Sequence, residues 1–157
     1  TGRNYEVCPE AEDLIEKYFS IYPNVRRFIE DTRDRCSDDL YVQTIVGRYR
    51  RLPDILASER WLSQRAQRQS VNSIIQGSAA DIAIEAMLRC ESSPDLRRLG
   101  VRMLLQIHDE LIFEVPDIPE IVEEAKVHVR RLMEDPIPMR VPIAVSMDDA
   151  YSWGEAK

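Results

Sequence analysis

Three polar side chains interrupt two apolar stretches in the segment LLQIHDELIFEVP. The flanking alternation predicts β-strands over 101–107 and 111–115, which places His108, Asp109 and Glu110 at the turn of a hairpin. Such a turn would hold the Asp109 carboxylate with little freedom, next to that of Glu110. Mg²⁺ takes oxygen ligands and commonly uses one or two protein carboxylates plus substrate phosphates. The segment therefore fits a metal-dependent phosphoryl-transfer site, although aspartate is also common in turns for local reasons.

The same acids would suit a metal-dependent hydrolase, but the chain is short of the histidines that such enzymes gather around their ions. Its two histidines are His108 and His128, and His128 lies within the helical pattern KVHVRR. The three cysteines, Cys8, Cys36 and Cys90, are far apart and form no C-x-x-C pair. A zinc site or disulfide framework is therefore not expected, and reduced thiols in an intracellular protein are the simpler interpretation.

A second polar set, Arg68, Asn72 and Gln76, recurs at every fourth residue. Each step of four drifts by about 40° on an α-helix, so the three side chains share one face. All three can donate hydrogen bonds to the minor groove of a duplex, where purine N3 and pyrimidine O2 acceptors are common to all base pairs. An ordinary solvent-exposed helix face is the alternative. The opposite side carries apolar residues expected in the core: Val71, Ile74, Ile75 and Ile82.

Charge is unevenly distributed along this chain of 157 residues, which has the composition of one soluble domain. The net charge of −7 resides in residues 109–149, where eleven acids face four bases. Residues 48–76 instead hold six arginines against two acids. Guanidinium groups suit bidentate phosphate contacts, so this segment could face nucleic acid, with an ordinary ion-paired surface as the alternative. No apolar run approaches the roughly 20 residues that cross a bilayer, so no membrane partner is expected.

The periodicities predict an α+β fold, in which helices layer an antiparallel sheet. A long helix should run from Ser58 to about Cys90, and Gly77 near its middle should mark a kink or a close backbone approach, since glycine costs about 1 kcal/mol against alanine. Before and after it we expect, in order, helices over 8–23 and 24–36, two short strands turning at Gly47, a loop over 91–100, the hairpin, a helix over 118–134 and a last strand in VPIAVSM.

Two of these segments, RQSVNSIIQGSAADI and LLQIHDELIFEVP, together resemble the C-terminal part of a family A DNA polymerase, the bacterial DNA polymerase I type. The second resembles that family's motif C. AEDLIEKYFSIYPNV, GRYRRLPDI and VPIAVSMDDAYSWG are similar to the family in the same order. The resemblance implies that residues 1–60 are the C-terminal part of the fingers subdomain. Residues 61–157 would be the C-terminal part of the palm, with the motif C hairpin in its sheet.

The resemblance also implies roles for single residues. Asp109 would be one of two aspartates that hold two Mg²⁺ ions, and Glu110 a supporting carboxylate. His108 would lie near the primer terminus. The function implied is part of a template-directed polymerase that adds deoxynucleoside triphosphates to a primer 3′ end, in the 5′ to 3′ direction. Contacts to the minor groove of primer-template DNA would come from Arg68, Asn72 and Gln76.

Two features of the family have no counterpart in this sequence. We find no motif resembling D-Y-S-x-x-E, which carries the second aspartate, and no fingers helix resembling K-x-x-x-F-G-x-x-Y-G; Lys17 and Lys126 lie in other contexts. The two-metal site would thus be completed by a residue outside this chain, which is predicted to be inactive alone.

A polymerase fragment, or one chain of a split enzyme, would have the missing N-terminal portion as its partner. It would work inside the cell, in the cytoplasm or nucleoid, with an organelle or a phage-encoded protein as further options. The alternative is a non-catalytic DNA-binding or scaffold subunit that retains the palm fold.

Overall fold

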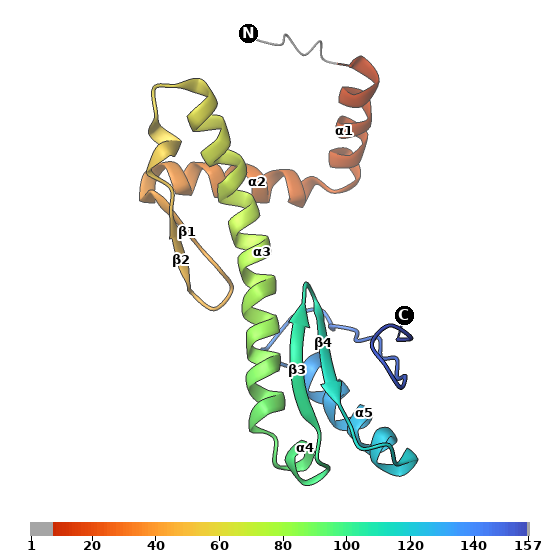
Figure 1. Cartoon of the computed structure of the whole chain (residues 1–157). Helices are drawn as coiled ribbons and strands as arrows, with labels where there is room; N and C mark the ends of the chain where they lie inside the picture. The colour runs from red at the N-terminus through yellow and green to blue at the C-terminus, as the bar shows by residue number, and fades with distance from the viewer. Residues whose placement is uncertain (1–7, 157) are drawn as a thin grey trace. The chain divides into compact units, whose positions relative to one another are not determined.

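The computed structural model describes residues 8–156, and the chain divides into two compact units, residues 1–78 and 79–157. Each unit combines helices with one two-stranded antiparallel sheet, which confirms the α+β class (Figure 1). The division into fingers and palm at residue 60 is a functional assignment and stays a prediction. Within residues 8–156, no helix is long and apolar enough to span a membrane.

The first unit opens with two helices, α1 (Pro9–Ile21) and α2 (Pro23–Asp39), close to the predicted bounds. Proline begins both helices, where its missing N–H costs no hydrogen bond. The Arg26 guanidinium donates to Glu16 across the two helices at 2.7 Å and also lies 4.6 Å from the centre of the Phe19 ring. No residue of α1 is buried, and all of its large apolar side chains except the half-buried Phe19 are open to solvent.

A short hairpin follows, made of β1 (Tyr41–Gln43) and β2 (Tyr49–Arg51), as predicted. Gly47 lies in the turn with φ +86°, a backbone conformation that residues other than glycine rarely adopt. After the 3₁₀ helix η1 (Pro53–Leu56), the chain enters α3 (Arg60–Ser92). The core of this unit packs α2, the hairpin, η1 and α3 together through Cys36, Val42, Leu52, Ile55 and Ala66, with Ile74 at its edge.

Gly77 lies within the uninterrupted helix α3 and marks a close approach. A Cβ built on Gly77 would lie 2.6 Å from Cγ2 of Thr44, in the hairpin turn. The Arg48 guanidinium also donates to the Gly77 carbonyl oxygen at 3.2 Å. The predicted close approach is therefore confirmed, and it is made by a side chain of the hairpin.

We expect Gly77→Ala to destabilise the chain, although alanine is the better helix former. The short, branched Thr44 side chain cannot yield easily, and overpacking of this kind costs about 1–3 kcal/mol. Thr44→Ala removes the obstructing methyl group, so the double variant should recover the stability lost and gain from the higher helix propensity of alanine. Urea denaturation of the single and double variants measures both effects. A Gly77→Ala chain more stable than the parent would contradict this packing.

The second unit begins in the last turns of α3 and continues into α4 (Pro94–Arg98), a short helix where the sequence predicted a loop. The prediction was wrong because the cap signal was overlooked. The Ser93 hydroxyl accepts a hydrogen bond from the Leu96 N–H, and Pro94 occupies the first helical position. Serine followed by proline is a helix start that can be found in sequence alone.

The predicted hairpin is formed by β3 (Arg102–Ile107) and β4 (Glu110–Glu114), and α5 (Pro119–Glu134) follows as predicted. Buried Cys90, Leu96 and Val129 form the core of this unit. The partly buried residues packed against this core come from the position just before β3, from β4, from α5 and from the segment that follows it: Val101, Phe113, Leu132, Met133 and Met147.

A bulge changes the faces of β3. Met103 pairs with Phe113, but Leu105 pairs with Ile112, which leaves Leu104 as an extra residue. Because paired residues point to the same face, Leu105 lies on the opposite face from Met103. The apolar residues that alternate along β3 in the sequence are therefore divided between the two faces of the hairpin.

The predicted last strand is absent from the described residues: 142–150 have no regular secondary structure. The segment keeps the alternation of a strand, with Ile143, Val145 and Met147 half-buried between exposed neighbours. However, the Val145 N–H donates to a Glu134 carboxylate oxygen at 3.4 Å and not to another strand. Alternating burial gives the sequence signal, but a strand also requires a backbone partner.

The buried thiols of Cys36 and Cys90 are expected to be unreactive. Burial raises the pKa of Cys90 to about 11, and burial together with the nearby Asp39 charge raises that of Cys36. Cys8 is exposed, and all three cysteines are free. Because the thiolate is the reactive form, neither buried cysteine is a candidate nucleophile.

Candidate active site and nucleic-acid interface

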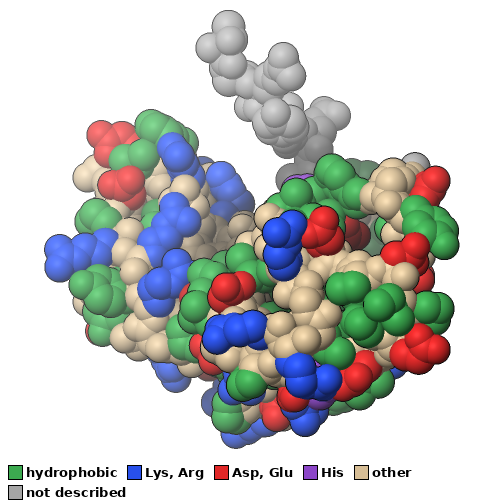
Figure 2. All heavy atoms as spheres, turned by 60° about the horizontal axis from the view of Figure 1, so that its bottom comes forward, with side chains coloured by type: hydrophobic (Ala, Val, Ile, Leu, Met, Phe, Trp, Pro, Cys, Tyr) green, Lys and Arg blue, Asp and Glu red, His purple; other side chains and the backbone are tan. Residues whose placement is uncertain are grey.

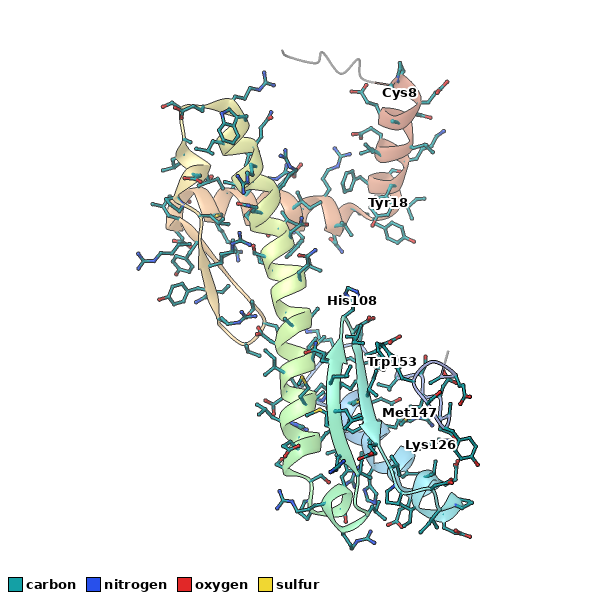
Figure 3. The ribbon with its side chains drawn as sticks, viewed as in Figure 1. Cys8, Tyr18, His108, Lys126, Met147 and Trp153 are labelled. Atoms are coloured by element: carbon teal, nitrogen blue, oxygen red, sulfur yellow. The ribbon has the colours of Figure 1, made fainter. Side chains whose placement is uncertain are left out.

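The β3–β4 hairpin turns through two residues, His108 and Asp109. Ile107 is paired with Glu110, so Glu110 is already the first residue of β4 and not part of the turn. His108 has φ +52°, in the left-handed region. The Gln106 side-chain amide donates to the His108 carbonyl oxygen at 3.0 Å, which stabilises the turn. Figure 3 shows His108 at the tip of the hairpin.

Within residues 8–156, the acids at the tip of the hairpin make no ion pair, whereas the acid at its base does. Asp109 and Glu110 are exposed, and neither has a basic partner among residues 8–156. At the other end of the hairpin, Glu114 accepts from both Nε and Nη2 of Arg102, with the Nε distance at 2.9 Å. The tip is thus the part of the hairpin at which negative charge stays available to a cation.

Oxygen ligands on a short turn suit Mg²⁺, which usually takes only one or two protein carboxylates. Asp109 fits that role, with Glu110 next to it. In the part of the chain that the structure describes, no group of three or more histidine, cysteine or acidic side chains converges. A site for two ions at Asp109 would therefore need a further carboxylate from outside these residues.

Arg68, Asn72 and Gln76, which we call the donor stripe, lie on one face of α3, as their spacing predicts. Arg68, Asn72 and Gln76 are all exposed along one face of the helix. Ala66, two residues before Arg68, and Ser70, between Arg68 and Asn72, are buried, so the helix separates a polar face from the packed one. The stripe belongs to the first unit and the β3–β4 turn to the second.

One residue assigned to the core side of the helix lies elsewhere. Ile75 is 57% exposed, next to Gln76, and does not belong to the core. Successive residues on a helix are separated by 100°, and here the packed side includes Ile74 but ends before Ile75. Val71, Ile74 and Ile82 are partly buried, as expected for the packed side.

Sequence reasoning missed a set of side chains on the β1–β2 hairpin. Tyr41, Gln43, Tyr49 and Arg51 are all exposed and share one face of the two strands. A signal was available, because two strands that turn at Gly47 place alternate residues of each strand on one face of the hairpin. Figure 2 shows Lys and Arg side chains gathered on the left of the visible face, over the part of the first unit that holds this hairpin.

Comparison with known proteins identifies the family to which this chain belongs. The family model for DNA polymerase family A matches residues 7–155. The chain is 41% identical over 148 residues to the thermostable DNA polymerase I of Thermus filiformis, and 41% identical over 147 residues to DNA polymerase I of Mycobacterium leprae. These alignments cover 94% of this chain but only 17% and 16% of the two relatives.

A solved structure shows the same relationship. The POL domain of Pol1 from M. smegmatis, in complex with DNA primer-template and dNTP, is similar with a TM-score of 0.82 and 39% identity. The match covers 87% of this chain and 24% of that one. The chain belongs to DNA polymerase family A. It spans about a sixth of the length of the polymerase I relatives that it matches.

Proposed function

We propose that this chain forms part of a template-directed DNA polymerase, which adds deoxynucleotides to the 3′ end of a primer by a two-metal mechanism. The β3–β4 turn is the observation that carries this proposal. It fixes Asp109 between two paired strands and leaves its carboxylate without an ion pair among the described residues. Family membership supports the assignment of this turn to motif C.

In this proposal Asp109 is a shared magnesium ligand, and Glu110 supports it from the first position of β4. When bound, the two ions would activate the primer 3′ hydroxyl and stabilise the leaving pyrophosphate. His108, in the same turn, would face the primer terminus. The second aspartate and the cationic groups that bind the triphosphate would come from the N-terminal portion of the polymerase. The assembled enzyme would work inside the cell, in the cytoplasm or nucleoid.

The donor stripe would contact the minor groove of the primer-template duplex. Arg68, Asn72 and Gln76 present N–H groups on one exposed helix face, and the groove offers acceptors at every base pair. Such contacts test the shape of a base pair and carry little sequence information. They would therefore help the enzyme to distinguish a matched primer end from a mismatched one.

Arg68→Ala and Gln76→Ala are each expected to slow extension of matched primers by about 2- to 150-fold, since a lost hydrogen bond costs about 0.5–3 kcal/mol. Discrimination against mismatched primers should change as well, whereas thermal stability should not. Single-turnover extension on matched and mismatched primers, with the assembled polymerase, measures both effects.

Arg130→Ala is the matched control for the stripe. Arg130 is an exposed arginine on α5 with no ion pair among residues 8–156, so its loss should leave both rates unchanged. If Arg68→Ala and Gln76→Ala behaved like this control on both primers, the stripe would be an ordinary solvated face.

A further inference from the structure

One face of the β1–β2 hairpin is fixed against α3. Val42 is buried in the core of the first unit, and Arg50, on the same face, donates to the Ser73 hydroxyl at 3.1 Å. At the turn, the Ile45 N–H donates to the Ser78 hydroxyl at 2.9 Å. These contacts hold the hairpin along the helix, so its other face has a defined shape before any partner arrives.

The other face carries two tyrosines in contact. The register pairs Tyr41 with Arg51 and Gln43 with Tyr49, so these four side chains point to the same side. The two rings lie 5.9 Å apart between centroids, in an edge-to-face arrangement. Tyr49 is 62% exposed and Tyr41 38% exposed, so the aromatic surface is open to solvent. We call Tyr41, Gln43, Tyr49 and Arg51 the tyrosine platform.

The charge around the tyrosine platform is positive. Residues 41–51 contain three arginines and no acid, in a chain whose net charge is −7. Arg51 lies on the platform itself and makes no ion pair with any residue that the structure describes. The nearest acids in the sequence, Asp39 and Asp54, lie outside both strands.

Exposed aromatic rings beside guanidinium groups match the chemistry of an unpaired nucleic-acid strand. Its bases have free faces that stack on tyrosine, and its phosphates pair with arginine. In a duplex the bases are already stacked on one another, so a double strand could use the arginines but not the rings. The platform therefore favours a single strand over a duplex.

We propose that the tyrosine platform binds single-stranded DNA by stacking bases on Tyr41 and Tyr49 and by pairing a phosphate with Arg51. This inference deepens the proposed function, because a polymerase must hold the unpaired part of its template. It assigns that role to the β1–β2 hairpin, apart from the α3 stripe and the β3–β4 turn.

The test is fluorescence anisotropy at low salt with the whole chain and a labelled single-stranded oligothymidine, compared with a blunt duplex of equal length. The Tyr41→Ala/Tyr49→Ala variant should weaken binding of the single strand about tenfold or more, because each base stacked on an aromatic ring contributes substantially to the free energy of binding. Binding of the duplex should change less than about twofold, since phosphate contacts to the arginines remain. Tyr41→Phe/Tyr49→Phe keeps the rings and should bind like the parent.

Tyr151→Ala is the control for an unrelated tyrosine, because Tyr151 is 89% exposed and belongs to the second unit. If the double alanine variant loses its circular dichroism signal, Tyr49→Ala alone and Arg51→Glu, both at exposed positions, replace it. Cross-linking of a 5-iodouracil-containing oligonucleotide, mapped by mass spectrometry, should label Tyr41 or Tyr49.

Unchanged affinity for the single strand in folded alanine variants would overturn the proposal, as would an equal loss for single strand and duplex. The assay does not depend on catalysis. A polymerase that failed to extend primers while its chain bound oligothymidine through the platform would refute the proposed function alone. Extension without platform-dependent binding would refute this inference alone.

Discussion

Asp109→Ala is expected to lower nucleotide incorporation by about a thousandfold or more in the assembled polymerase. A metal site that loses one of its shared ligands forfeits several kcal/mol of transition-state stabilisation, and about 1.4 kcal/mol corresponds to a factor of ten. The fold should survive, because Asp109 is exposed and makes no ion pair with the described residues. Single-turnover primer extension with Mg²⁺ measures the effect, with circular dichroism as the folding control.

Two further variants separate charge from shape. Asp109→Asn keeps the size of the side chain and removes the charge, so it should be nearly as inactive as the alanine variant. Asp148→Ala removes an exposed acid that lies outside the hairpin, and it should leave the rate unchanged. Parental rates in either Asp109 variant would remove this residue from the proposed site.

The second large effect concerns the chain by itself, which should not extend a primer. The described residues bring no group of three or more histidine, cysteine or acidic side chains together, and the sequence has no motif resembling either the family's other aspartate or its fingers helix. DNA binding should be weak and sensitive to salt, because the phosphate contacts would come mainly from arginines in residues 48–68 and face an acidic C-terminal segment.

The same chain should gain activity when the complementary N-terminal part of its polymerase is added. Its helix α1 buries none of its own residues and exposes Leu14, Ile15 and Tyr18, which together form an apolar surface suited to a partner. Size-exclusion chromatography should show either self-association or a complex with the complementary part. Primer extension with Mg²⁺ and all four deoxynucleotides, before and after mixing, then measures the gain.

The outcomes of mixing distinguish the candidate functions. Activity that appears only in the complex supports a polymerase divided between two parts. Robust extension by the chain alone would contradict the prediction that catalysis needs a second aspartate and a fingers helix from outside this chain. An assembled complex that binds DNA without extending it would favour the alternative, a DNA-binding or scaffold subunit that retains the palm fold.

Much of the local structure followed from the sequence, because it depends on residues that are neighbours along the chain. Apolar spacing and prolines located α1, α2 and α5, and Gly47 located the turn between β1 and β2. The alternation on both sides of His108 and Asp109 located the hairpin that carries the proposed magnesium ligand. The donor stripe needed only the period of the helix, which is a local property too.

What the tertiary structure alone decided depends on partners that are distant along the chain. The burial of residues 142–150 alternates as in a strand. A strand also requires backbone hydrogen bonds to a neighbouring strand, and within the described residues this segment is not paired with one. The bulge at Leu104 is visible only once β3 and β4 are paired, and it moves Leu105 to the other face. Gly77 is explained by Thr44, 33 positions earlier, because packing brings a hairpin side chain against the helix. Periodicity predicts how a segment can fold, whereas contacts between segments determine which backbone groups are paired and which faces are buried.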